Sequence, residues 1–326
     1  MLKKTYQACL LAGFFLILTG CQATPQTDRL TKQPPADIPA AYYIQHVPFT
    51  AQQQYYCGPT TLSEVFGYHG YPVAPEAIAP RIFIPEREGS LQLEMVSATR
   101  QFGFLPYTEQ GTLNKLLQLV SADIPVIVLQ NLSVEWLPQW HYAVVIGYDL
   151  STETLTLHTG VTPDYTMALT VFERTWARGN HWMLAPLPHN KVSEHLNAFT
   201  YVSAAYDMLT TGQASKALPF LEAATSYWPD DWLAYFLLGN HYLSTHPEQA
   251  IDWFAKGFHA GQHHPAYLNN FAHVLAQEGC KEQALELLRM GRDAFPDEKM
   301  LVVTEQQVTQ IDSNMRCPGG EGIDMR

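Results

Sequence analysis

Basic side chains are scarce in this sequence of 326 residues. Lysine and arginine together number 19, against 31 aspartates and glutamates, so the formal net charge at pH 7 is −12. Proteins that bind nucleic acid carry clusters of basic side chains that meet the phosphate backbone. The composition therefore argues against nucleic acid as a partner. Hydrophobic residues make up 47 % of the chain, which is enough to build the cores of two domains.

An apolar run of membrane-spanning length is lacking as well. The run of residues 8–18 is shorter than the ~20 apolar residues that a spanning helix needs. It follows two lysines and ends in a Leu-Thr-Gly-Cys sequence at Cys21, a pattern typical of a bacterial lipoprotein signal peptide. We predict that residues 1–20 are removed and that Cys21 carries the lipid. Residue 22 is Gln22 rather than an aspartate. The resemblance to bacterial lipoproteins then implies the outer membrane rather than the inner one, so we predict an outer-membrane lipoprotein that faces the periplasm. An ordinary signal peptide or an uncleaved anchor, in either case with a chance cysteine, is the alternative.

Cysteines are few, at Cys9, Cys21, Cys57, Cys280 and Cys317. Cys9 leaves with the signal peptide and Cys21 is lipidated, so three remain in an oxidising compartment where two can pair. We predict a disulfide between Cys280 and Cys317, which lie 37 residues apart. Closing a loop of that size stabilises a protein by about 3–4 kcal/mol. This pairing leaves Cys57 as a free thiol; two unpaired thiols at Cys280 and Cys317 are the alternative.

The pattern along the chain changes several times. Residues 21–41 comprise the lipidated cysteine and a polar, proline-rich stretch that predicts a flexible tether. Residues 42–190 mix helix and strand signals, with helices first and strands after, which is typical of an α+β domain. Helices are predicted near residues 57–69 and 90–102, the second capped by Ser90. Strands are predicted at residues 125–130, 142–148, 154–158, 167–172 and 181–184.

Strand signals disappear in residues 191–312. Ala217, Ala250 and Ala284 recur at separations of 33 and 34 residues, and a small residue follows each of them seven positions later. This period is similar to that of tetratricopeptide repeats, in which helix–turn–helix units stack through small residues. We therefore predict an all-α, tetratricopeptide-like repeat domain, with an irregular helical bundle as the alternative. Residues 313–326 form a C-terminal tail.

The most informative segment surrounds Cys57, which precedes Gly-Pro at a predicted helix N-terminus. Unpaired N–H groups at such an end favour a thiolate, and the thiolate is the nucleophile of a cysteine hydrolase. Gln52 carries an amide that can donate to an oxyanion. A nucleophilic cysteine needs a histidine to move its proton, and His141 opens an apolar strand between Trp140 and Tyr142. Cys57 as a buried apolar residue and His141 as a packing residue are the alternatives.

These segments resemble the bacteriocin-processing, double-glycine-leader type of papain-like cysteine peptidase. The resemblance lies in Gln52 with the following Cys57-Gly-Pro, and in His-Tyr-Ala-Val-Val-Ile-Gly-Tyr-Asp from His141. It covers residues 42–188, and is nearest to the lipoprotein branch with a repeat tail. The resemblance implies a papain-like fold, Cys57 as nucleophile, His141 as general base and acid, Gln52 in the oxyanion hole, and cleavage of peptides after small residues.

The sequence departs from this family at the third catalytic position. The family places an aspartate or asparagine on the strand after the histidine strand, whereas His158 or Thr159 occupies that place here. We predict that His158 orients His141, more weakly than a carboxylate does. Asp149 ends the histidine's own strand, where a turn role is expected.

The sequence thus predicts a lipoprotein cysteine peptidase that acts on a peptide or protein and binds a protein partner through its repeats. The membrane is contacted through the lipid anchor only. An inactive peptidase-fold scaffold and a Cys–His acyltransferase are the alternatives. No cofactor or metal is expected, because the histidines of the repeats (His259, His263 and His264) lie near a turn without a set of carboxylates.

Overall fold

The computed structural model describes residues 23–84, 89–311 and 317. The predicted signal peptide and Cys21 lie outside these residues, as does nearly all of the C-terminal tail. The chain divides into two compact units. The first comprises residues up to Met95 together with Thr108–Ala185, and the second comprises Val96–Tyr107 together with residues from Pro186 onward. Within the described part of the chain, no helix has both the length and the apolar character needed to cross a membrane.

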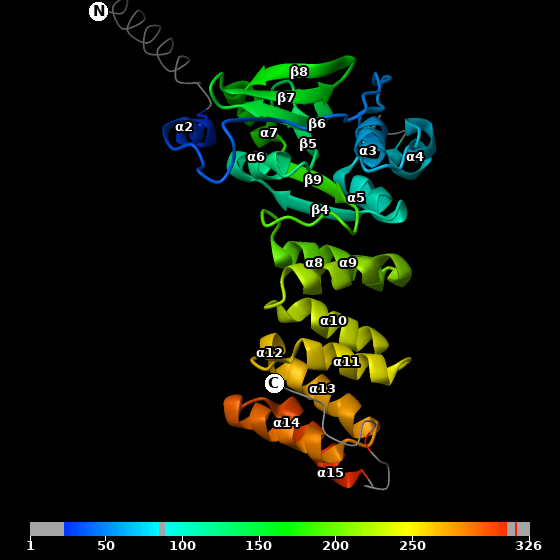
Figure 1. Ribbon diagram of the computed structural model, residues 1–326. Helices are drawn as coiled ribbons and strands as arrows, with labels where there is room; N and C mark the ends of the chain where they lie inside the picture. Colours follow the sequence, from blue (N-terminus) through cyan, green and yellow to red (C-terminus); the bar gives the residue numbers. More distant parts are fainter. Residues whose placement is uncertain (1–22, 85–88, 312–316, 318–326) are drawn as a thin grey trace, which may run out of the picture. The chain divides into compact units, whose positions relative to one another are not determined.

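A mixed set of helices and strands precedes residue 188 (Figure 1). The helices are α2 (Pro25–Lys32), α3 (Cys57–Tyr68), α4 (Pro75–Ile82), α5 (Gln92–Gln101), α6 (Leu113–Ser121) and α7 (Leu169–Arg178). The strands are β1 (Ala41–Tyr43), β2 (Phe83–Ile84), β3 (Gly89–Ser90), β4 (Leu105–Gln110), β5 (Val126–Asn131), β6 (Trp140–Asp149), β7 (Thr154–Thr159), β8 (Thr162–Ala168) and β9 (Trp182–Leu187). The α+β class predicted from the sequence is confirmed.

The main sheet has the order β4-β9-β5-β6-β7-β8, and β1 also pairs with β6. The pairs β5–β9, β5–β6, β6–β7 and β7–β8 are antiparallel. Helices α3 and α6 contact β6, and α7 contacts β5. Leu62, Val65 and Phe66 of α3 are fully buried at helical spacing, so packing against β6 fixes the helix that begins with Cys57.

One predicted strand is wrong. Residues 167–172 contain the end of β8 and the start of helix α7, which begins at Leu169. Leu169, Phe172 and Trp176 are all buried, at the three- and four-residue spacing of a helix face. The predicted strand, residues 167–172, was too short to show the helical period. A longer window that included Trp176 would have revealed it. The predicted cap Ser90 also belongs to β3, because α5 begins at Gln92.

The predicted tether is corrected over much of its length. Residues 25–32 form helix α2, and its first turn docks on the carboxylate of Glu173 in α7. The backbone N–H groups of Gln26 and Thr27 donate to Glu173 at 2.9 and 2.7 Å, and the Thr27 hydroxyl donates at 2.7 Å. A carboxylate at a helix N-terminus satisfies the unpaired N–H groups and the helix dipole. A partner far along the chain supplies this cap, so local sequence could not reveal it.

The C-terminal region is helical, as predicted. Its helices are α8 (Ala198–Thr210), α9 (Ala214–Tyr227), α10 (Trp232–Tyr242), α11 (Pro247–Lys256), α12 (Phe258–Gly261), α13 (Pro265–Gln277), α14 (Lys281–Ala294) and α15 (Lys299–Gln310). Helices α8 to α11 each pack against the next, as do α13 to α15, and α13 also contacts α11 (Figure 1). Ala217, Ala250 and Ala284 are fully buried. The tetratricopeptide assignment stays a prediction. Cys280 and Cys317 form a disulfide.

Candidate active site

Cys57 is the first residue of α3 and lines a large cavity of the first unit. Its thiol is free. The next residue must be small: a Cβ on Gly58 would lie 2.7 Å from the Ser90 Oγ atom. The glycine therefore lets the start of α3 and strand β3 meet closely, and both then form part of the cavity wall. Pro59 lies in the first turn, where its missing N–H is not needed.

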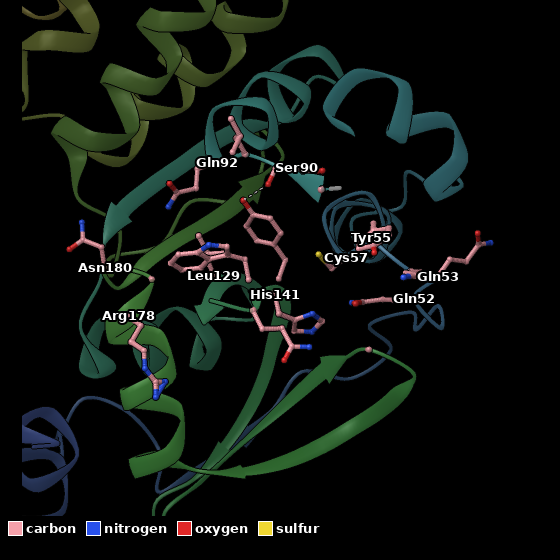
Figure 2. Close-up of a pocket in the computed structure, with 18 residues that line it drawn as sticks. Gln52, Gln53, Tyr55, Cys57, Ser90, Gln92, Leu129, His141, Arg178 and Asn180 are labelled. Atoms are coloured by element: carbon pink, nitrogen blue, oxygen red, sulfur yellow. Dashed lines mark hydrogen bonds between the residues drawn. The ribbon is translucent and has the colours of Figure 1, made fainter. Parts of the chain in front are cut away.

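His141 is the second residue of β6 and lines the same cavity. Strand β6 brings the two candidates together, because the backbone N–H of Tyr142, the next residue, lies close enough to the Cys57 sulfur to lower the pKa of the thiol. Figure 2 shows the Cys57 sulfur, the His141 ring and the Gln52 side chain directed to one part of the cavity. Its volume of about 1020 Å³ is large enough for a segment of peptide.

The protonation states differ from the sequence prediction. Burial raises the pKa of the Cys57 thiol, although the backbone N–H groups of Tyr142, Gly58 and Cys57 itself oppose the rise. Burial also lowers the pKa of His141, to about 4. Both shifts follow from the cost of placing charge away from water. At neutral pH the resting pair is therefore a thiol and a neutral imidazole, in place of the thiolate expected from the helix N-terminus alone, and the imidazole is free to accept a proton.

The orienting partner of His141 is Thr159. The His141 Nε2 atom and the Thr159 hydroxyl lie 2.7 Å apart and form a hydrogen bond. A hydroxyl can accept a hydrogen bond from an imidazole N–H and so hold one tautomer, although it lacks the negative charge of a carboxylate. The contact leaves Nδ1 as the ring nitrogen that can act as base.

The prediction that His158 orients His141 is corrected. His158 pairs with Val144 across β6 and β7. Because side chains alternate along a strand, His158 lies on the face opposite to His141. Its Nε2–H donates to the Val47 carbonyl at 3.1 Å, and its Nδ1 accepts from the Asp164 N–H at 3.3 Å. Both ring nitrogens are thus engaged away from the catalytic pair.

Gln52 reaches the cavity from a segment without regular structure. Its backbone N–H donates to the Gly160 carbonyl at 2.9 Å, next to Thr159 on the chain. The amide nitrogen Nε2 of its side chain is buried and has no hydrogen-bond partner among the described residues. A buried donor without a partner is costly, and an oxyanion formed beside Cys57 would satisfy it.

Two features of the site were not predicted. The Tyr142 N–H, which lies near the Cys57 sulfur and lowers the pKa of the thiol, is a backbone group that sequence analysis cannot identify. Glu64 is a carboxylate inside the buried face of α3, 1 % exposed. An acidic residue between Leu62 and Val65 in an apolar helix face was a visible signal. Elsewhere, no group of three or more potential metal ligands forms within the residues that the structure describes.

Comparison with known proteins finds a family model that matches part of the chain. Residues 44–181 match the model of the Peptidase_C39 like family, a span that includes Gln52, Cys57, His141 and Thr159. No curated protein matches the chain. One similar solved structure is a C39-like peptidase from Bacillus anthracis, with 18 % identity and a TM-score of 0.39 over 47 % of this chain and 99 % of that one.

Two further solved structures are similar to part of the chain. A double glycine motif protease from an AMS/PCAT transporter, in complex with the leader peptide, has 20 % identity and a TM-score of 0.34 over 44 % of this chain and 94 % of that one. The peptidase domain of Streptococcus ComA, a bifunctional ABC transporter of a quorum-sensing pathway, has 22 % identity and a TM-score of 0.35 over 43 % of this chain and 99 % of that one.

Proposed function

We propose that the Peptidase_C39-like domain formed by residues 44–181 is a cysteine peptidase with Cys57 as nucleophile and His141 as general base and acid. One observation carries the proposal. A free thiol and a neutral imidazole line one cavity, and the imidazole is oriented from behind by a hydrogen bond to Thr159. This is the arrangement of nucleophile, base and orienting group that covalent hydrolysis requires.

The reaction follows from this geometry. As the Cys57 sulfur attacks the carbonyl carbon of a peptide bond, the thiol proton passes to Nδ1 of His141. The carbonyl oxygen becomes an oxyanion, which accepts hydrogen bonds from Gln52 Nε2 and the Cys57 backbone N–H. His141 then gives its proton to the leaving amine, and a thioester remains on Cys57. Water, deprotonated by His141, cleaves the thioester and restores the thiol.

Peptide hydrolysis tests this function directly. The wild-type protein and the variants Cys57→Ser and His141→Ala are incubated with fluorogenic peptides that carry glycine or alanine before the scissile bond. We expect hydrolysis by the wild type and a loss of about 100-fold or more in both variants. Iodoacetamide labelling adds a second readout: Cys57 should be labelled selectively, and more slowly in His141→Ala.

An inactive scaffold is the second candidate, and Thr159 is the observation that favours it. A hydroxyl does not stabilise an imidazolium as a carboxylate does. In that case no peptide would be cleaved, and Cys57 would react with iodoacetamide no faster than a free cysteine. An acyltransferase is the third candidate function. It would transfer the acyl group from Cys57 to an added amine, with little hydrolysis of the peptide.

The remaining parts of the proposal concern location and partners. The sequence ending at Cys21 supports a lipid anchor and a periplasm-facing position at the outer membrane. The helical C-terminal region would bind a protein or peptide, as stacked helical hairpins do. Fractionation of cells that express the wild type or Cys21→Ser tests the lipid anchor. Affinity capture with the purified wild-type and Cys21→Ser proteins tests binding by the helical region.

A further inference from the structure

The segment that carries the oxyanion donor has no regular structure of its own. This oxyanion segment, residues 47–52, lies between β1 and α3 and belongs to no helix or strand. Its position must therefore come from contacts with other elements. An oxyanion donor has to lie about 3 Å from the place where the charge develops, so whatever fixes this segment affects the chemistry.

The first contact comes from the helix of the nucleophile. The Thr50 backbone N–H donates to Glu64 Oε1 at 3.0 Å. Glu64 lies two helical turns after Cys57 on α3 and is 1 % exposed, and its second oxygen, Oε2, has no partner among the described residues. Burial raises the pKa of Glu64 to about 8. The carboxyl is therefore mainly neutral at pH 7, and it still offers the carbonyl oxygen that Thr50 needs.

The second contact comes from the strand that carries Thr159. His158 is 2 % exposed, and its Nε2–H donates to the Val47 carbonyl at 3.1 Å. The Phe49 ring packs edge-on against the His158 ring, with centroids 5.2 Å apart. On its other side, His158 accepts from the Asp164 N–H, and the Asp164 carboxylate accepts from the Tyr43 hydroxyl at 2.6 Å.

These contacts tie the oxyanion segment to both catalytic walls. Glu64 links it to α3, which positions the sulfur of Cys57. His158 links it to β7, whose last residue, Thr159, positions His141. We infer that Glu64 and His158 are positioning residues that set the location of the Gln52 amide relative to the Cys57 sulfur. The inference rests on the proposed peptidase function and assigns a role to two buried polar side chains that touch neither sulfur nor imidazole.

The test separates two reactions of Cys57. Alkylation by iodoacetamide forms a C–S bond and expels iodide, so it creates no oxyanion. Addition of the thiol to a peptide aldehyde ending in glycinal forms a C–S bond and breaks the C=O π bond. The thiol proton passes to His141, and the oxygen becomes an oxyanion in the oxyanion hole. Glu64→Met removes the acceptor at similar volume, Glu64→Gln keeps it, and His158→Phe keeps the ring and removes both hydrogen bonds.

We expect Glu64→Met and His158→Phe to bind the aldehyde about tenfold or more weakly than the wild type. Their alkylation rates should stay within about twofold, because the sulfur and its base are not displaced. Glu64→Gln should recover most of the lost affinity. In a Gln52→Ala background, Glu64→Met should cause no further loss, since the donor that Glu64 positions is absent.

Full aldehyde affinity in Glu64→Met and His158→Phe would overturn the inference, and so would an undiminished second loss in the Gln52→Ala background. Failure of the proposed function has a different signature: the wild type itself would bind no aldehyde, or Gln52→Ala would leave its affinity unchanged. Hydrogen exchange at residues 47–52 then decides the positioning role. Faster exchange in Glu64→Met than in Glu64→Gln supports it, and equal exchange refutes it.

Discussion

The protonation state of His141 depends on its burial and on its hydrogen-bond partner, Thr159. Its pKa is lowered to about 4 by burial, and its partner Thr159 carries no charge to oppose this effect. The neutral ring is suited to accept the Cys57 proton, but the imidazolium that follows receives little stabilisation. Thr159 therefore holds the geometry of a catalytic triad without its electrostatics.

Replacing Thr159 by a charged acceptor should change this balance. In Thr159→Asp we expect the pKa of His141 to rise by about one unit or more, because a carboxylate near an imidazole favours its charged form. NMR titration of the His141 ring measures the shift. Thr159→Val, which keeps the shape and removes the hydroxyl, is the matched control and should slow peptide hydrolysis without raising this pKa. An unchanged pKa in Thr159→Asp would mean that the hydrogen bond does not form.

Glu64 gives the stability of the protein a dependence on pH. Its pKa is about 8 in the folded state and about 4.3 in an unfolded chain. The folded state thus holds the proton more tightly, so stability is fully present below about pH 4 and falls as pH rises toward 8. We expect Glu64→Gln to remove this loss and to be more stable than the wild type by up to about 5 kcal/mol at pH 9. Urea unfolding of both proteins at pH 5, 7 and 9 measures the difference, which should grow with pH; a constant difference would contradict the assignment.

At the scale of elements, the sequence predicted helices and strands from their regular apolar patterns. It did not predict contacts between residues that are distant along the chain. The helix predicted after Cys57 is confirmed as α3, in which Leu62, Val65 and Phe66 are buried at helical spacing. The apolar run after His141 predicted β6. These patterns express burial of one local face. Helix α2 was missed because its N-terminal partner, Glu173, is distant in sequence. The sequence did not show that Thr159, rather than His158, contacts His141. This contact depends on the register of β7 against β6, which cannot be read from the sequence of either strand alone.

The helical region offers an element-scale test at a pair of equivalent glycines. Gly257 and Gly291 both follow a repeat alanine by seven residues, but their surroundings differ. A Cβ at Gly257 would lie 2.4 Å from Tyr235 atoms and 2.6 Å from the Tyr267 hydroxyl, whereas a Cβ at Gly291 would meet the Leu301 side-chain tip at 3.1 Å. We expect Gly257→Ala to destabilise the region by about 1–3 kcal/mol, since overpacking forces rings to move. Gly291→Ala should cost less.

Thermal unfolding followed by circular dichroism compares these two variants. Iodoacetamide labelling of Cys57 in each variant serves as the control, because Cys57 belongs to the other unit and should react at the wild-type rate. Equal stability of Gly257→Ala and the wild type would show that the helices separate easily at this point. Such a result would also weaken the comparison with tightly stacked repeats.

At the scale of the whole molecule, helix α2 decides how far the proposed lipid anchor reaches. Three residues separate Cys21 from Pro25, the first residue of α2. An extended chain spans at most about 3.6 Å per residue, so a lipid on Cys21 would hold the start of α2 within about 15 Å of the membrane. The flexible tether predicted from the sequence would instead have allowed the whole of residues 21–41 to extend.

Release of α2 should therefore lengthen the anchor and expose it to protease. The Glu173 carboxylate holds the first turn of α2 through three hydrogen bonds, which Glu173→Ala removes. In membranes that hold the wild-type protein through the proposed lipid on Cys21, we expect Arg29 and Lys32 to resist trypsin, because cleavage needs a locally unfolded chain. In Glu173→Ala, trypsin should cut there and release the protein into the soluble fraction. Cys21→Ser, which has no lipid, should be soluble before any protease is added. Membrane retention of Cys21→Ser would refute the anchor, whereas equal trypsin resistance of Glu173→Ala and the wild type would refute only the short tether.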